Sequence, residues 1–344
     1  MRPEEGHQGD RGRKAVSAIL RGGFISLASF VPFVSLALSP SSAAAADRYA
    51  LVVTGASGGD NYALKYDSWR TTFVDLLHGF NYPDDHLVVL AEQEQGPVRK
   101  ATRDNVRAAL TDLRRRSEKD DVVVVLLIGH GTAGDGDEAK FNLVGPDLSA
   151  DEWAALVRPI PAKVVFIDTT AGSFPFLKKI AGKNRIVITA TDNAAQQFET
   201  VFPEFLVKAF GEEGADQDKN GKVSVWEAFQ YASAHVRDWF ADRGQLATER
   251  PLLDDSGAGI GREFDTPGPD GPVALVTYLE PEAPIANTGN TELDALLRRR
   301  AELQMRLEAL KARKGSMPAD DYDAELEKIL LELARIDRQV RTKS

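Results

Sequence analysis

Between residues 49 and 210 the chain alternates short apolar runs with segments in which apolar residues recur every three or four positions. Uninterrupted aliphatic runs predict strands buried on both faces, and the three-to-four spacing predicts amphipathic helices. Strands are predicted at 49–53, 86–91, 122–128, 164–167 and 185–190. Helices are predicted at 66–77, after Thr102 or Asp104, after Ser149 with Glu152 as its capping-box partner, and at 202–210. This alternation predicts an α/β domain at 47–266, built on a doubly wound, mostly parallel sheet with helices on both faces.

The C-terminal part has a different pattern. The stretch 267–290 is rich in proline and glycine, and we interpret it as a linker with one short strand at 273–279. Beyond it, 291–344 carries two apolar stripes with the spacing of packed helices. Their members are Leu293, Leu296, Leu303, Leu307 and Leu310, then Leu326, Leu330, Leu333, Ile336 and Val340. With Gly315 and Pro318 between them, the stripes predict an antiparallel helical hairpin (coiled coil), either a packing appendage or a module for self-association or partner binding.

The N-terminal segment 1–46 has the pattern of a signal peptide. An apolar run at 24–38 is preceded by Arg11, Arg13, Lys14 and Arg21. Ala44 and Ala46 fit a cleavage site before Asp47, which places the mature chain outside the cytoplasm, in the periplasm or secreted. The rival interpretation is an uncleaved anchor, for which about fifteen apolar residues are short.

Composition narrows the possible functions. The formal net charge is −10, and no long basic patch occurs outside the termini, so nucleic-acid binding is not expected. The chain has no cysteine. An exported protein without cysteine has no disulfides, and its stability must come from the hydrophobic core.

Two loops follow central strands and carry residues suited to catalysis. His130 stands between two glycines after the strand at 122–128, and its imidazole suits a general base. The loop from Asp168 to Ser173 follows the strand at 164–167 and offers the hydroxyls of Thr170 and Ser173. Sites in parallel sheets form beyond the carboxyl ends of the strands, so these residues are expected in one cleft, with Gly131 and Asp168 lining it. The alternative is that the hydroxyls bond backbone groups at a tight turn.

The segment 216–227 matches the calcium-binding loop of an EF-hand. It places oxygen ligands at positions one, three, five, seven, nine and twelve, with Gly221 at the sharp turn. The predicted Ca²⁺ ligands are Asp216, Asp218, Asn220, the backbone carbonyl of Lys222, Ser224 and Glu227. A solvated acidic turn is the alternative. No second complete loop is present, which favours a structural calcium over a paired sensor. Residues 254–259 form a second acidic turn with a weaker case for a cation.

These motifs together resemble the legumain-type branch of the caspase-like peptidases. The resemblance rests on Gly55 with the run 58–62, on His130-Gly131, on Ile167-Asp168 and on the run 189–191. It implies a caspase-like sheet, a catalytic histidine at His130 and a catalytic cysteine at the position of Thr170. The family's specificity-pocket arginine has no counterpart, because Ala63 stands there. The acidic loop and the hairpin resemble additions found in uncharacterised bacterial exported proteins that carry this domain.

Three functions follow as hypotheses. The first is an exported, catalytically inactive domain that binds a peptide or protein by strand addition at a free sheet edge and is stabilised by calcium. The second, which is the alternative to the first, is an active peptidase or hydrolase. In it, Thr170 or Ser173 attacks the substrate, His130 acts as base and N–H groups near Gly131 stabilise the oxyanion. A threonine hydroxyl is a much poorer nucleophile than a thiolate, which favours the first. The third is a scaffold in which the hairpin carries the function.

Overall fold

The computed structural model describes residues 46–133, 138–196, 198–281, 288–312, 314 and 317–343, all within one compact unit, Ala44–Ser344. The predicted signal segment, apart from Ala46, lies outside the described residues.

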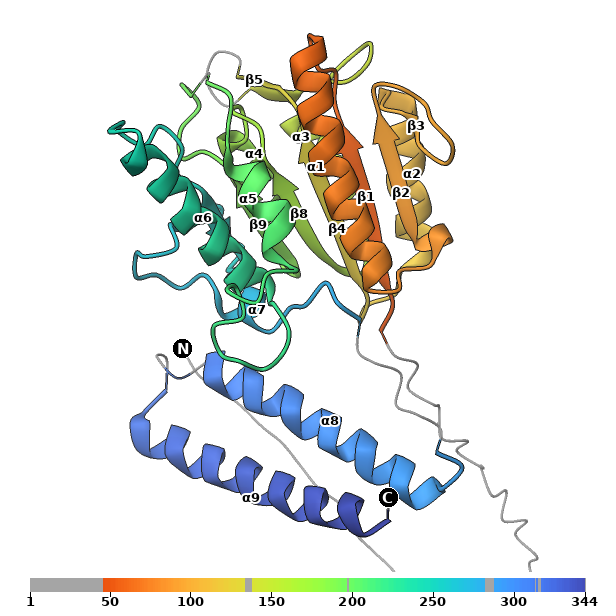
Figure 1. Cartoon of the computed structure of the whole chain (residues 1–344), viewed down its shortest axis with the longest axis vertical. Coiled ribbons are helices and arrows are strands. Elements are labelled where there is room, and N and C mark those ends of the chain that lie inside the picture. Colours follow the sequence, from red (N-terminus) through yellow and green to blue (C-terminus); the bar gives the residue numbers. More distant parts are fainter. Residues whose placement is uncertain are drawn as a thin grey trace, which may run out of the picture. The chain divides into compact units, whose positions relative to one another are not determined.

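The centre of this unit is a seven-stranded sheet in the order β10-β9-β8-β4-β1-β2-β3 (Figure 1). Its strands are β1 (Arg48–Thr54), β2 (Leu87–Ala91), β3 (Arg99–Lys100), β4 (Val122–Ile128), β8 (Lys163–Asp168), β9 (Arg185–Thr189) and β10 (Leu252–Asp254). All neighbours pair in parallel except β10, which is antiparallel to β9. The α/β class and the mostly parallel sheet are as predicted.

The aliphatic run of β4 explains why this strand is central. All seven of its residues are buried, and successive side chains point to opposite faces of the sheet. Val124 and Leu126 therefore join one core cluster, while Val123 and Val125 join the other. A strand with apolar side chains on both faces must be covered by helices on both sides.

Helices cover both faces accordingly. One core cluster is formed with α1 (Asp60–Gly79), α5 (Phe202–Ala209) and α6 (Val225–Asp242). The other is formed with α2 (Arg103–Arg116), α3 (Ala150–Val157) and α4 (Phe174–Ile180). The predicted caps are present, since Thr102 accepts from the Asn105 N–H and Ser149 forms a capping box with Glu152.

Two short features were not predicted from the sequence. A three-stranded antiparallel sheet in the order β5-β6-β7 lies beyond the end of β4 and consists of β5 (Gly131–Ala133), β6 (Ala139–Phe141) and β7 (Leu148–Ser149). A 3-10 turn, η1 (Asp84–His86), precedes β2 and takes up the first residue of the predicted strand 86–91.

The prediction of a strand at 273–279 is wrong. The structure has a short helix, α7 (Pro272–Leu275), followed by a single bridge between Tyr278 and Ser224. Proline at the first helical position starts a helix readily, because its fixed φ suits the helix and its missing N–H is not needed there. The Asp255 carboxylate accepts from the N–H groups of Val273 and Ala274, which satisfies the helix start. Asp255, in the turn considered for a cation, therefore has backbone partners at the start of α7.

The C-terminal hairpin consists of α8 (Thr291–Ala312) and α9 (Ala319–Lys343). It is antiparallel, since Glu292 at the start of α8 pairs with Lys343 at the end of α9. Leu330 was predicted in the packed stripe but is 47% exposed, whereas the adjacent Ile329 is 1% exposed. A shift of one residue turns a helical side chain by about 100°, which is enough to exchange the two. None of the described helices combines the length and apolarity that a membrane span requires.

Candidate functional site

The two catalytic-type loops follow neighbouring strands. Strands β4 and β8 pair in parallel, with Leu127 opposite Asp168, so the loops after them leave the same edge of the sheet. A side chain added at Gly131 would overlap the Thr170 hydroxyl and would contact the backbone of Gly172. The sheet thus brings the predicted His130 and Thr170 loops into direct backbone contact, and only glycine fits between them.

The His130 imidazole is held by groups from two other elements. Its Nε2 lies 3.0 Å from the Ser57 carbonyl oxygen, and the Tyr66 hydroxyl lies 3.3 Å from Nδ1 and 3.2 Å from Nε2. A carbonyl oxygen only accepts, so we assign the proton to Nε2, and Nδ1 then accepts from the Tyr66 hydroxyl. The ring of Tyr62 packs edge-on against the imidazole, with 4.7 Å between the two ring centroids. Both ring nitrogens therefore have partners, and neither partner is Thr170 or Ser173.

Tyr66 stays protonated at neutral pH. Burial raises the pKa of its hydroxyl well above the ordinary value, and the negative charge of Glu199 raises it further. This tyrosine is not among the predicted site residues, because its place in the apolar pattern of α1 is typical of ordinary core packing. Its spacing of four from Tyr62 puts both rings on one helix face, and that was the available signal.

Thr170 and Asp168 lie beneath the surface. Both are fully buried, and in the described part of the chain Thr170 Oγ1 and Asp168 Oδ2 have no hydrogen-bond partner. Asp168 Oδ1 accepts from the Thr170 N–H at 2.9 Å. Burial raises the pKa of the Asp168 carboxyl to about 7, against the lowering effect of hydrogen bonding from Thr170. A fully buried hydroxyl is poorly placed to meet a substrate.

Ser173 uses its hydroxyl to join α4 to the end of β9. Its Oγ accepts from the Ala190 N–H at 3.0 Å and the Thr191 N–H at 3.2 Å, and it shares a hydrogen bond with Thr191 Oγ1 at 3.0 Å. This is the backbone-satisfying role that the sequence left open as an alternative.

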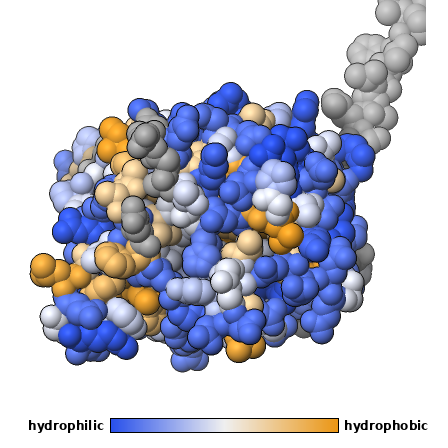
Figure 2. Space-filling model, turned by 90° about the horizontal axis from the view of Figure 1, so that it is seen from above, coloured by the Kyte–Doolittle hydropathy of each residue, from blue (hydrophilic) through white to orange (hydrophobic). Residues whose placement is uncertain are grey.

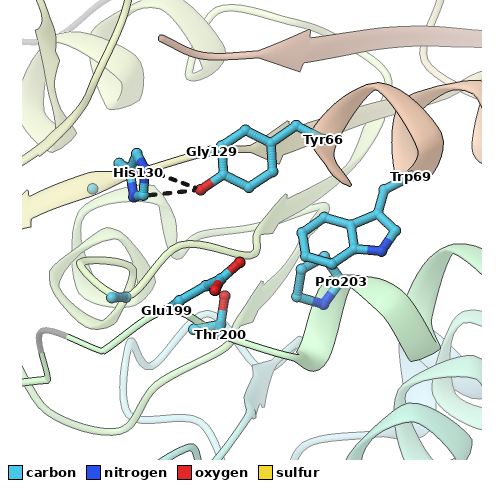
Figure 3. Close-up of a pocket in the computed structure, with 9 residues that line it drawn as sticks. Tyr66, Trp69, Gly129, His130, Glu199, Thr200 and Pro203 are labelled. Atoms are coloured by element: carbon cyan, nitrogen blue, oxygen red, sulfur yellow. Dashed lines mark hydrogen bonds between the residues drawn. The ribbon is translucent and has the colours of Figure 1, made fainter. Parts of the chain in front are cut away.

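A small pocket opens beside His130, with about 40 Å³ of free space. It is lined by Tyr66, Trp69, Gly129, His130, Gly131, Ala171, Glu199, Thr200 and Pro203. In Figure 3 the Tyr66 hydroxyl points at the imidazole, and the Glu199 carboxylate points toward the middle of the pocket. Glu199 precedes α5, and the buried carboxylate of Glu249 accepts from the N–H of Val201 and from that of Phe202, the first residue of the helix. Burial raises the pKa of Glu249 to about 7.

The acidic loop, residues 216–227, brings its carboxylates together. Oxygens of Asp216, Asp218 and Glu227 lie within 4.8 Å of one another, close enough to share one ion. Asp216 accepts from the N–H groups of Asn220 and Gly221, and Gly221 has φ of 86°, which favours glycine. These residues fit a calcium ion, whose positive charge the three carboxylates would neutralise.

The remaining predicted ligands occupy the same loop. Asn220 Oδ1 accepts from the N–H of Lys222, whose carbonyl stands at the seventh position. Ser224 caps α6 and forms a capping box with Glu227. Glu227 also accepts from the N–H of Asp218 at 3.2 Å, so its carboxylate links the loop's start to the helix that follows. The N–H of Val225 donates to the Thr277 carbonyl, which fixes the loop against the segment after α7.

No protein-family model matches the chain, and no curated protein matches it. Among solved structures, the chain is similar to protein GSU0716 from Geobacter sulfurreducens, with 13% identity, a TM-score of 0.41, and coverage of 63% of this chain and 97% of that one. It is also similar to the Drosophila initiator caspase Dronc, with 12% identity, a TM-score of 0.41, and coverage of 63% of this chain and 82% of the caspase.

Proposed function

We propose that the chain is an exported, caspase-like domain of the legumain type without peptidase activity, which binds a peptide or protein and a structural calcium ion. The observation that carries the proposal is the state of His130. Its loop touches the Thr170 loop as in a peptidase site, yet Ser57 and Tyr66 occupy both imidazole nitrogens. To activate the Thr170 hydroxyl, His130 would need a free ring nitrogen close to it, because the base must accept the hydroxyl proton.

A free strand edge beside His130 supports peptide binding. Among the described residues, β5 pairs with β6 alone. The Asn142 N–H donates to the His130 carbonyl, so this pair is hydrogen-bonded and the next pair, Gly131 with Phe141, is not. The N–H and C=O of Gly131 then point away from β6, and the backbone of Gly172 packs close to Gly131. An extended peptide gains main-chain hydrogen bonds by pairing there.

Labelling with a fluorophosphonate tests the absence of peptidase activity. We expect no adduct on Thr170 or Ser173, with or without Ca²⁺. The matched controls are His130→Ala and His235→Ala, since His235 lies on α6 and its Nδ1 hydrogen-bonds the Tyr231 carbonyl of the same helix. An adduct that His130→Ala abolishes and His235→Ala preserves would establish the hydrolase alternative.

Amide hydrogen exchange tests peptide binding at β5. A pool of blocked, extended hexapeptides at millimolar concentration should slow exchange at Gly131 while leaving β3, at the far edge of the large sheet, unchanged. Equal protection at both edges, or none at Gly131, contradicts strand addition beside His130.

Export is tested on the full chain. Expressed in a bacterium and recovered from the periplasm or the medium, the protein should begin at Asp47 when its N-terminus is measured by mass spectrometry. Recovery of the intact chain from the membrane fraction would support the uncleaved anchor instead.

A further inference from the structure

One acidic side chain, that of Glu199, lines the pocket beside His130. Lys65, which is not among the lining residues, pairs with it. The opposite walls are the aromatic rings of Tyr66 and Trp69 (Figure 3). A carboxylate facing aromatic rings is the combination that binds an organic cation, because the ring faces are negative and the carboxylate completes the charge.

Lys65 shows how a cation contacts Glu199 and Trp69, two of the lining residues. Its Nζ lies 2.6 Å from Glu199 Oε1 and 5.6 Å from the centroid of the Trp69 ring. One ammonium group thus contacts both recognition elements, and it comes from the helix that also carries Tyr66 and Trp69. The pair is partly exposed, at 43% for the Lys65 side chain and 29% for Glu199, and exposed ion pairs of this kind hold weakly. A second ammonium can therefore displace Lys65 at small cost.

The pocket has room for an ammonium group. Its free space of about 40 Å³ accommodates a few water-sized groups. The surrounding surface is also polar, and Figure 2, which views the end of the molecule that carries β5, shows mainly hydrophilic residues there with limited apolar patches. We therefore expect charge, more than apolar contact, to decide which ligand binds at this end of the molecule.

We propose that the pocket is an ammonium-binding subsite, in which Glu199 and Trp69 hold a lysine side chain of a bound peptide and Lys65 is the built-in competitor. This rests on the proposed peptide-binding function. A peptide paired along β5 lies next to Gly131, which lines the same pocket as Glu199. One side chain of the peptide can then reach Glu199. Lys65 leaves the carboxylate when that side chain enters.

The test uses three pentapeptides of alanine, titrated into the full chain by NMR or calorimetry at low salt. One has a blocked N-terminus and a central lysine, one is blocked with central norleucine, and one has norleucine and a free N-terminus. We expect the lysine peptide to bind at least about tenfold more tightly than blocked norleucine. Tighter binding of the free N-terminus than of lysine would identify the terminal amine as the source of the ammonium and overturn the lysine assignment.

Two variants and one control sharpen the test. Glu199→Gln should reduce the lysine preference to within about twofold, and Lys65→Met should tighten lysine-peptide binding by about threefold, because the competitor is gone. Lys208→Met removes an equal charge from a pair with Glu204 on α5 and should change nothing. Equal binding of the lysine and norleucine peptides overturns the subsite but leaves peptide binding intact, whereas no binding by any peptide overturns both.

Discussion

The strand-end loop, Asp168–Ser173, and the acidic loop, 216–227, both lead into a helix, and both are rich in side-chain oxygen atoms. They differ in whether these oxygens are buried or reach solvent. In the strand-end loop Asp168, Thr170 and Ser173 are fully buried, and two of their oxygens have no partner within the described residues. In the acidic loop the carboxylates of Asp216 and Asp218 reach solvent and converge with that of Glu227. Burial favours uncharged oxygens, whereas convergence at the surface keeps the charges and favours a cation. The first loop is therefore suited to structure and the second to binding.

The largest expected effect concerns the charge of Asp168. Burial raises its pKa from the ordinary aspartate value of 3.8 to about 7, so the folded state holds the proton more tightly. Its contribution to stability is full below the lower value and is lost as pH rises through about 7, by at most about 4 kcal/mol. We expect urea unfolding to show a less stable protein near pH 8 than near pH 5. Asp168→Asn, which cannot ionise, should flatten that dependence.

Glu249 provides the matched comparison for this prediction. Its pKa is also raised to about 7 by burial, and its carboxylate binds the N–H groups of Val201 and Phe202. The residual pH dependence of Asp168→Asn should therefore become smaller in the double variant with Glu249→Gln. An Asp168→Asn protein that loses as much stability as the parent between pH 5 and pH 8 would contradict a buried, proton-holding carboxyl.

The second prediction concerns the acidic loop. Calcium at a hundred times its dissociation constant should stabilise the chain by about 2.7 kcal/mol, and a chelator should remove that gain. Glu227→Gln should abolish the calcium-dependent part, because it removes the carboxylate that joins both ends of the loop. The measurement is the melting temperature with and without Ca²⁺, so that loss of the α6 cap cancels in the difference.

Lys219→Asn is the control in the same loop. Lys219 has φ of 60°, a conformation that asparagine tolerates, and it offers no predicted ligand. It should keep the full calcium response. A melting temperature of the parent protein that is unchanged by chelator would remove calcium from the proposed function.

The same contrast explains what the sequence could predict. The acidic loop was predicted because its ligands lie within twelve consecutive residues and their spacing specifies the turn. The neighbouring strand ends were predicted because the all-aliphatic β4 must be central. The partners of His130 were not, since Tyr66 comes from a helix 64 residues earlier in the chain and Ser57 from another loop. Such contacts depend on how α1 packs over the sheet, which no local pattern encodes.

A third prediction compares the two hydroxyls of the strand-end loop. Ser173→Ala removes the acceptor of the buried Thr191 N–H and one of the two acceptors of the Ala190 N–H, which keeps the Asp168 carbonyl, and should cost about 2 kcal/mol. Thr170→Val removes a buried hydroxyl that has no partner and keeps the side chain's shape, so it should change stability by less than about 1 kcal/mol. Denaturant unfolding of both variants gives the comparison. A larger loss for Thr170→Val would assign Thr170 the structural role instead.

The smallest expected effect is that of restoring the sulfur. Thr170→Cys supplies the atom that legumain-type peptidases use, yet we expect no cleavage of fluorogenic peptides, because His130 is held by Ser57 and Tyr66. Burial raises the pKa of a thiol, so the new cysteine should react with iodoacetamide at least about a hundredfold more slowly than one at the exposed Thr71. Thr71→Cys thus gives the reference rate. Fast alkylation of Thr170→Cys that His130→Ala slows would mean that the imidazole does reach this position, and the site would then be a peptidase centre lacking only its nucleophile.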